Sequence, residues 1–337
     1  METRARILEI PRFLRETLEK GVREYETLIR HVRWGEGPIY ICCCGASLPV
    51  GMAGVYLFEW LAGWPVVAHS SKVFEAYALS TVRPRSVLVV ISARGEWPEA
   101  QELAREALER GCTTVGLTNT PDSPLAKLAD HVFLTPAEGD AESPAAMVCL
   151  HAALNFLAFE AMRVLKKPKQ WWDLVEKDFD QLPNKLDWVF TQLPSVVRSV
   201  AAEVARLPRL RIVGGGFNHY PAWHGAWRLR SLASPQVGEV EASEFLNEHA
   251  YFARRGESVL LLSGSHSKMK KLVHRGAAQT RMNGARVLSL TDSNDQELVK
   301  SSDLGIMVPS LLEMPASTLT LFMLEWLGME ALHAAKP

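Results

Sequence analysis

Two loops in this chain have the residue types that hold a phosphate or another anion. The first is Gly45-Ala46-Ser47, and the second is Ser92-Ala93-Arg94-Gly95-Glu96, directly before Trp97-Pro98. Each loop follows a strand-like apolar run and precedes a helix-like stretch. Backbone N–H groups at a helix N-terminus attract anions, and serine hydroxyls add short hydrogen bonds. The sequence therefore predicts an anion site, although a serine- and glycine-containing loop after a strand is also compatible with a plain turn.

Neither loop carries a nucleotide signature, because Gly-x-Gly-x-x-Gly and Gly-Lys-Ser/Thr sequences are missing. The run Gly214-Gly215-Gly216 lacks the third spaced glycine of a dinucleotide site. Cysteines 42 to 44 are consecutive, and adjacent strand residues point to opposite faces, so three in a row do not converge on one ion. The sequence thus indicates no nucleotide cofactor and no metal, and it favours buried strand cysteines.

The two loops belong to a unit that occurs twice in the chain. One strand-like run begins at Ile39 and a similar one at Leu210, and Ser258 stands 172 residues after Ser86, each opening an apolar run. Further matches at nearly the same offset pair Gly111–Asn119 with Gly284–Asp292 and Leu125–Asp130 with Leu298–Asp303. A repeat that keeps its offset over this length indicates a duplicated domain.

In the first copy, apolar runs alternate with helix-like stretches, which predicts an α/β fold. The runs lie at 39–44, 65–69, 86–91, 112–117 and 131–134. Such alternation is typical of a parallel sheet covered by helices on both faces. We expect a helical N-terminal segment at 1–37, a first domain at 38–165, a helical connector at 166–208 and a second domain at 209–333. Ligands of such sheets bind at the carboxyl ends of the strands, where both loops are expected.

Composition excludes several partners. The net charge is −1 without a basic stripe, so nucleic-acid binding is not expected. No uninterrupted apolar run approaches the length of a membrane span, and no apolar region follows the charged N-terminus, so neither a membrane span nor a signal peptide is expected. Five cysteines, an odd number, favour a reduced cytoplasmic location.

Both copies resemble the sugar isomerase (SIS) domain family, over about residues 1 to 333. The resemblance is carried by Cys44–Leu48, Phe58–Gly63, Val89–Glu96 and Thr114–Asn119 in the first copy, and by Gly215–Pro221 and Thr291-Asp292 in the second. It implies two tandem flavodoxin-like parallel-sheet α/β sandwich (SIS) domains. It is closest to the isomerase half of glutamine–fructose-6-phosphate amidotransferase and to deglycases of fructosamine 6-phosphates. Because the glutaminase half is missing, a synthase reaction with glutamine is not expected.

The resemblance implies a sugar-phosphate ligand. Ser47 matches a family serine after the first strand, and Ser92 and Gly95 match a Ser-x-Ser-Gly-x-Thr phosphate loop. Arg94 and Trp97 replace the second serine and the threonine of that loop. Arg94 is either a bidentate phosphate contact that offsets the lost hydroxyls or a solvated loop arginine.

The family's catalytic positions are substituted in this chain. Asp140 is the counterpart of a family glutamate, and Met147 stands where a lysine is expected. In the second domain, Ser231 and Asn247 fall at the positions of the proton-transfer glutamate and the ring-opening histidine.

Other acid–base groups of the second domain are candidates for those roles. With a two-residue shift His249 matches the histidine, and Glu241 or Glu244 matches the glutamate; His224 and His219 are further candidates. Aldose–ketose isomerisation requires such a base and acid near C1 and C2 of the sugar. A polar helix face and loop charges explain the same residues.

Two functions are therefore expected as alternatives. One is a phosphosugar isomerase or fructosamine-6-phosphate deglycase, and the other is a catalytically silent sugar-phosphate sensor that acts on a partner. The resemblance also implies a homodimer, and the ten tryptophans of the chain are in keeping with an aromatic interface.

Overall fold

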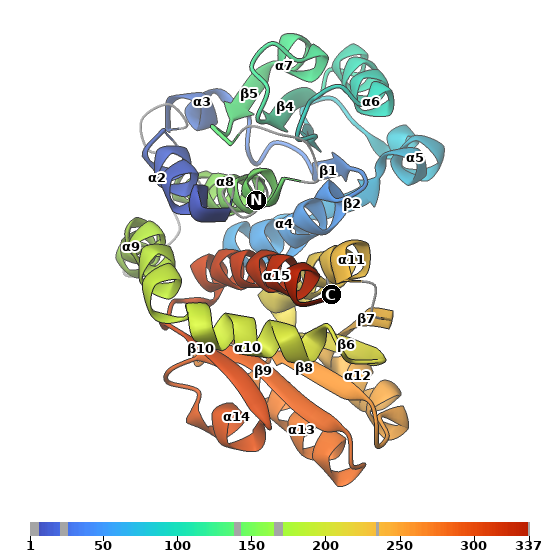
Figure 1. Ribbon diagram of the computed structural model, residues 1–337. Coiled ribbons are helices and arrows are strands. Elements are labelled where there is room, and N and C mark those ends of the chain that lie inside the picture. The colour runs from blue at the N-terminus through green and yellow to red at the C-terminus, as the bar shows by residue number, and fades with distance from the viewer. Residues whose placement is uncertain (1–6, 21–25, 138–142, 165–170, 234–235, 336–337) are drawn as a thin grey trace. The chain divides into compact units, whose positions relative to one another are not determined.

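Figure 1 shows the computed structural model, which describes residues 7–20, 26–137, 143–164, 171–233 and 236–335. The chain forms two compact units, here called the first unit (residues 5–173) and the second unit (residues 174–337, with 1–4). The N-terminal helices thus belong to the first unit. Almost all of the expected connector belongs to the second unit, because that unit begins at Leu174.

The first unit contains a five-stranded parallel sheet of order β2-β1-β3-β4-β5. Its strands are β1 (Ile39–Cys43), β2 (Val66–Ser70), β3 (Val87–Ile91), β4 (Thr113–Thr118) and β5 (His131–Leu134). Its helices are α2 (Ile10–Lys20), α3 (Glu26–His31), α4 (Ser47–Ala62), α5 (Ser71–Val73), α6 (Pro98–Glu109), α7 (Pro124–Leu128) and α8 (Pro144–Val164), with short π- and 3-10 turns at Phe74–Ala78 and Leu79–Thr81. Helices α2, α4 and α8 cover one face of the sheet, and α5, α6 and α7 cover the other (Figure 1).

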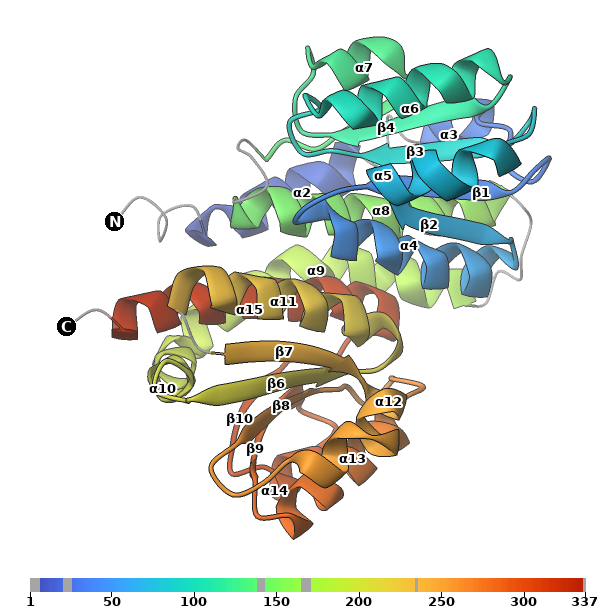
Figure 2. The same cartoon turned by 90° about the vertical axis from the view of Figure 1, so that its right-hand side faces the viewer.

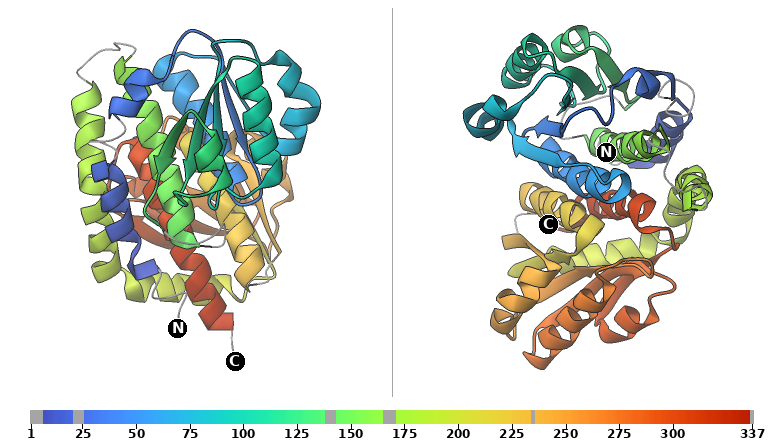
Figure 3. Two further views of the ribbon diagram at one scale, coloured as in Figure 1. Left: turned by 90° about the horizontal axis from the view of Figure 1, so that it is seen from above. Right: turned by 180° about the vertical axis from the view of Figure 1, so that it is seen from behind.

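The second unit repeats this arrangement with the order β10-β9-β8-β6-β7. Its strands are β6 (Arg209–Gly214), β7 (Gln236–Glu241), β8 (Ser258–Leu262), β9 (Arg286–Asp292) and β10 (Leu304–Val308). Its helices are α9 (Trp172–Gln192), α10 (Pro194–Val204), α11 (His219–Ala233), α12 (Ala242–Asn247), α13 (Lys270–Met282), α14 (Gln296–Ser301) and α15 (Glu313–Ala335), with 3-10 turns at Gly216–Asn218 and His249–Phe252. Helices α10, α11 and α15 cover one face and α12 to α14 the other, as Figures 2 and 3 show from further sides.

When the strands of each unit are numbered in chain order, both sheets have the order 2-1-3-4-5. This is the order of flavodoxin-like sheets. The prediction of two tandem parallel-sheet α/β domains is therefore confirmed. Each sheet is buried on both faces, which explains why β1, β3 and β8 read as continuous apolar runs.

The core on the α6 side of the first sheet holds Cys42 of β1. Cys42 packs in one buried cluster with Tyr40, Phe74, Leu88 and Val90. Burial raises the pKa of Cys42 to about 12, against a hydrogen bond with Ser71 that lowers it. The thiol is therefore protonated at neutral pH and serves as a small core residue.

Helix α8 is long and apolar enough to cross a membrane by length and composition alone. The residues Pro144–Met162 are buried inside the structure, as in the core helix of a folded domain, so the helix is weak evidence for a membrane span. The expectation of no membrane partner stays a prediction.

Candidate functional site

The two predicted loops lie next to each other at the carboxyl edge of the first sheet. The loop 45–47 follows β1 and the loop 92–96 follows β3, and these strands pair in register, with Cys43 opposite Ile91. The chain continues from β1 to β2 on one side and from β3 to β4 on the other, so the strand order reverses between β1 and β3. Ligands of doubly wound sheets bind in the crevice at this point.

The first loop opens directly into α4. Gly45 has a φ of +55°, a conformation that costs other residues energy, and the backbone N–H of Ser47 donates to the Cys44 carbonyl at 3.1 Å. Ser47 is buried at the start of α4, and the N-cap residue Ala46 provides no side-chain cap. The first N–H groups of this 16-residue helix therefore have no side-chain acceptor from the cap position.

Hydrogen bonds hold the second loop at the Gly95 N–H and at the Ala93 carbonyl. The N–H of Gly95 donates to the carbonyl and the hydroxyl of Ser92 at 3.0 and 3.2 Å. The carbonyl of Ala93 accepts from the Thr118 hydroxyl at 2.9 Å and from the Asn119 N–H at 3.0 Å. Among the residues that the structure describes, no carboxylate accepts from the backbone N–H groups at positions 94, 96 and 97.

Arg94 is exposed on its loop and forms an ion pair with Glu96. Its Nε lies 3.4 Å from Oε2 of Glu96, and both side chains are about 60 % exposed. An exposed ion pair of this kind contributes about 0–1 kcal/mol, so Glu96 does not hold the guanidinium firmly. Trp97 forms the N-cap of α6 and is also exposed. Contact of Arg94 with a phosphate stays a prediction.

Gly95 offers a direct test of the loop geometry. Gly95→Ala is expected to lower the free energy of unfolding by about 2–4 kcal/mol, because its φ is +64° and an added Cβ would overlap Oγ of Ser123 and lie 2.6 Å from its Cβ. Gly45→Ala is the matched control, since its φ is similar but no atom lies within 4 Å; it is expected to cost only about 1–2 kcal/mol. Chemical denaturation measures both, and equal losses would show that the Ser123 contact is unimportant.

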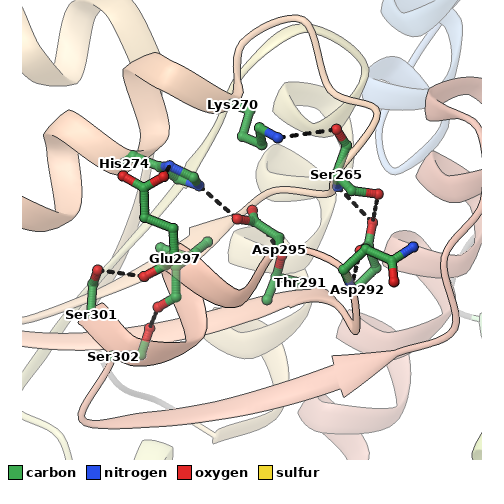
Figure 4. Close-up of polar contacts among 11 residues, drawn as sticks. Ser265, Lys270, His274, Thr291, Asp292, Asp295, Glu297, Ser301 and Ser302 are labelled. Carbon is green, nitrogen blue, oxygen red and sulfur yellow. Dashed lines mark hydrogen bonds and ion pairs between the residues drawn. The ribbon is translucent and has the colours of Figure 1, made fainter.

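The second unit has a corresponding loop that sequence reasoning missed. It is Ser263-Gly264-Ser265-His266-Ser267, directly after β8. The signal was present, because the strand before it was matched to the strand before Ser92. In this loop, carboxylates of the protein itself accept hydrogen bonds from the loop's N–H and hydroxyl groups, as Figure 4 shows for Asp292.

Two carboxylates share the donors of this second-unit loop. Asp292 accepts from the N–H of Ser265 at 2.6 Å and from its hydroxyl at 2.9 Å. Glu313 accepts from the Ser267 hydroxyl at 3.0 Å and from the Lys268 N–H at 3.3 Å. An anionic ligand would meet two carboxylates in this loop, whereas no carboxylate of a described residue accepts from the loop of the first unit.

Among the candidate acid–base groups, Glu241 and His219 lie on neighbouring strand ends. Glu241 ends β7 and is opposite Gly214 of β6, and His219 begins the helix that follows β6. Burial lowers the pKa of His219, and the negative charge of Glu241 opposes this shift. Nδ1 of His219 and Oε1 of Glu241 are both buried without a hydrogen-bond partner among the described residues. The two groups therefore have capacity for a further partner.

Glu241 also has a structural role, because its Oε2 caps α12 by accepting from the N–H groups of Ser243 and Glu244 at 2.7 and 3.4 Å. Glu244 lies exposed on α12, and His249 lies partly buried in the following 3-10 turn. The carbonyl of His249 accepts from Arg211 at 3.2 Å.

His224 is in a different environment from the other candidates. It is buried between α11 and α15, and its Nε2 lies 2.5 Å from Oε1 of Glu325. Arg228 contacts the same carboxylate at 2.5 and 3.0 Å. This buried triad explains His224 as a structural residue, and a proton-transfer role for it stays a prediction.

The SIS domain profile matches residues 34–161 and 205–329, which is most of the chain. The chain belongs to the SIS domain family. It is 24 % identical over 287 residues to the isomerizing glutamine–fructose-6-phosphate aminotransferase of Synechocystis sp., covering 82 % of this chain and 45 % of that protein. The corresponding enzyme of Methanosarcina mazei is 24 % identical over 294 residues, covering 86 % of this chain and 47 % of that protein. The chain thus spans about half the length of the curated relatives it matches.

Solved structures show the same SIS fold. The C-terminal domain of glucosamine-fructose-6-phosphate aminotransferase from Francisella tularensis has a TM-score of 0.89 at 16 % identity, covering 99 % of this chain and 96 % of that one. Tagatose-6-phosphate ketose/aldose isomerase from Escherichia coli has a TM-score of 0.80 at 15 % identity, covering 99 % and 93 %. At these identities the likeness establishes the fold alone.

Where this SIS chain departs from its family, the structure gives local explanations. Met147 is fully buried in α8. The hydroxyl of Ser231 donates to the Arg228 carbonyl at 2.9 Å, and Asn247 is exposed at the end of α12. Asp140 lies outside the described residues. Within the described part of the chain, no group of three or more His, Cys, Asp or Glu residues is placed to hold a metal ion.

A cavity of about 800 Å³ lies elsewhere in the second unit. It is lined mainly by apolar groups of α9, α10 and β10, among them Trp188, Val196 and Met307, with Lys185 at its edge donating to the Ser310 carbonyl at 2.5 Å. This cavity has the size of a small-molecule site. Its described lining also includes one serine, Ser293, and Leu193, the N-cap residue of α10.

Proposed function

We propose that this SIS protein binds a sugar 6-phosphate, with the phosphate at the carboxyl edge of the first sheet. The observation that supports this is the adjacency of the Ser47 and Ser92 loops where the strand order reverses, with loop N–H groups that no described carboxylate occupies. Charge-assisted hydrogen bonds from N–H and hydroxyl groups are the strong contacts of phosphate sites.

As its reaction we propose aldose–ketose isomerisation or deglycation of a fructosamine 6-phosphate. The first reaction moves a proton between C1 and C2 of the open-chain sugar, so it needs a base and an acid. We propose His219 and Glu241 as the proton-transfer pair, since they follow neighbouring strands of the second sheet and each keeps a buried atom without a partner among the described residues. The name of the E. coli neighbour, a ketose/aldose isomerase of a sugar 6-phosphate, supports this reaction class.

The second candidate is a sugar-phosphate sensor without catalysis. Met147 supports it, because a buried thioether stands where the family places an ionisable lysine. The neutral Ser231 and Asn247 at two further catalytic positions support it as well. None of these side chains ionises near neutral pH.

Proton exchange at C2 distinguishes the two candidates. A panel of hexose, amino-sugar and fructosamine 6-phosphates is incubated with the protein in D₂O, and deuterium at C2 is followed by NMR while calorimetry measures binding. Exchange that is lost in His219→Gln or Glu241→Gln supports the enzyme. Binding without exchange supports the sensor, and neither binding nor exchange across the panel would contradict the proposed function.

Arg94 is expected to contribute to phosphate affinity. Arg94→Ala should weaken sugar-phosphate binding by about 10-fold or more, since hydrogen bonds to charged groups contribute about 1.5–3 kcal/mol. Arg110→Ala is the matched control, because Arg110 is also exposed and paired with a glutamate, at 3.7 Å. Arg94→Ser restores the family serine, and if that variant binds more tightly than the wild type, Arg94 obstructs the site instead.

We also propose a homodimer, as the family resemblance implies. Trp188 on α9 is 46 % exposed and is therefore available to an interface. Trp171, in contrast, packs edge-to-face against Trp60 of the same chain, with 4.9 Å between the ring centroids. Exposed aromatic residues are enriched in interfaces. Sedimentation at micromolar protein should give twice the 37.5 kDa chain mass. A monomer that still binds sugar phosphate would contradict the dimer.

A further inference from the structure

The carboxyl edge of the second sheet contains a small cavity, lined by both polar and apolar side chains, that the proposed function does not use. It lies beyond the carboxyl ends of the neighbouring strands β6 and β8, at the point of this sheet where the strand order reverses. Its volume is about 20 Å³, which is room for one water-sized particle. Asn218, Ser263, Asp292 and Glu313 provide polar lining, and Leu311 and Leu319 part of the apolar lining.

Two lining side chains have hydrogen-bonding capacity that the protein leaves unused. Oδ1 of Asn218 and Oγ of Ser263 are buried without a partner among the described residues, and these side chains are only 4 % and 7 % exposed. A buried polar atom without a partner costs about 1–3 kcal/mol. Both atoms therefore point to a bound species, and both can act as acceptors towards it.

The carboxylates of the cavity set the charge of that species. Asp292 is satisfied by three donors, the N–H and hydroxyl of Ser265 and the N–H of Asn294, at 2.6, 2.9 and 2.8 Å. Oε1 of Glu313 accepts from Ser267 and Lys268, while its Oε2 has no partner among the described residues. One carboxylate oxygen thus stays available, together with the two buried oxygens.

The lining includes one basic side chain, His266, but no lysine or arginine among the described residues. Lys268 lies close enough for its charge to lower the pKa of Glu313, although burial, the larger effect, raises that pKa. Lys185 and Lys270 also lie nearby, bonded to the carbonyls of Ser310 and Ser265. An anion is disfavoured here, because its nearest neighbours would be two carboxylates.

We propose that this cavity binds a monovalent cation of the size of K⁺ or NH₄⁺, through Glu313, Asn218 and Ser263. A hard cation takes oxygen ligands of these kinds. A divalent ion fits less well, because Asp292 is already satisfied by three donors and only one carboxylate oxygen, on Glu313, is left without a partner among the described residues to balance its charge.

The cation is expected to stabilise the native chain by mass action. Thermal unfolding is followed at constant ionic strength while choline chloride is replaced stepwise by KCl or NH₄Cl. The midpoint should rise saturably with either small cation and stay flat with choline. Crystals grown in RbCl should show an anomalous peak within about 3 Å of the three oxygens, a coordination distance slightly above that of Ca²⁺.

Ser263→Ala and Glu313→Gln should each raise the K⁺ concentration for half the midpoint rise at least tenfold. The matched control is Ser86→Ala, which also removes a buried hydroxyl without a partner, but in the first unit; it should keep the wild-type cation dependence. Identical curves in K⁺ and choline would assign the cavity to water and overturn the proposal. So would a saturable response to Mg²⁺ without one to K⁺, no rubidium peak, or an equal loss in Ser86→Ala.

Discussion

Glu325→Ala is expected to lower the free energy of unfolding by about 3–5 kcal/mol, because it removes one partner of a buried ion pair. The Glu325 side chain is fully buried, and the His224 and Arg228 side chains are 1 % and 4 % exposed. Without the carboxylate, the buried guanidinium loses contacts at 2.5 and 3.0 Å. Urea denaturation of the full chain, followed by tryptophan fluorescence, to which Trp227 beside the triad contributes, measures the loss.

The matched control is Glu330→Ala on the same helix, where the indole N–H of Trp326 donates to the carboxylate at 3.2 Å. A neutral donor is involved there, so a smaller loss of about 1–2 kcal/mol is expected. If Glu325→Ala costs no more than Glu330→Ala, the triad does not stabilise α11 against α15.

The triad also sets a pH dependence. Burial raises the pKa of Glu325, but the charge of Arg228 and the hydrogen bond with His224 together outweigh burial and leave the pKa below its ordinary 4.5. A carboxyl with a lowered native pKa contributes stability above its unfolded pKa and loses it as the pH falls through the native one. Stability should therefore decline below about pH 4.5, and less steeply in Glu325→Ala.

The second large effect is expected at the phosphate loops. The Ser47→Ala, Ser92→Ala double variant should bind sugar 6-phosphate about 100-fold or more weakly, since each hydroxyl bond to a charged group contributes about 1.5–3 kcal/mol. Ser71→Ala is the matched control, because Ser71 is also a buried serine after a strand of this sheet, with its hydroxyl donating to the Cys43 carbonyl at 3.3 Å. Calorimetry should show unchanged affinity for the control, and unchanged affinity for the double variant would remove the two hydroxyls from the site.

The fold could be predicted because its signals are local and occur twice. Continuous apolar runs such as the one at Ile39 and the glycine at position 45 give the strand and the turn, and β1 ends at Cys43 within one residue of the expected end. The duplication extends the same reasoning to the second unit. Strand order followed from the family resemblance, since periodicity alone does not place β1 between β2 and β3.

The site could be predicted only in part, because its partners are far apart in the sequence. Glu325 lies 101 residues from His224, within a helix whose other residues are mostly apolar, and no local pattern links the two. Glu241 is a similar case, since its capping of α12 becomes visible only when the strand end and helix start are in place. The Ser263 loop could have been predicted from the sequence, because the repeat offset leads to it from Ser92.

A crystal structure with a bound sugar 6-phosphate tests the central claim most directly. We expect the phosphate within hydrogen-bond distance of the Ser47 and Ser92 hydroxyls and of backbone N–H groups between positions 94 and 97. Phosphate at the Ser263 loop, or a sugar in the 800 Å³ cavity beside Trp188 with the first-unit loops empty, would contradict the account.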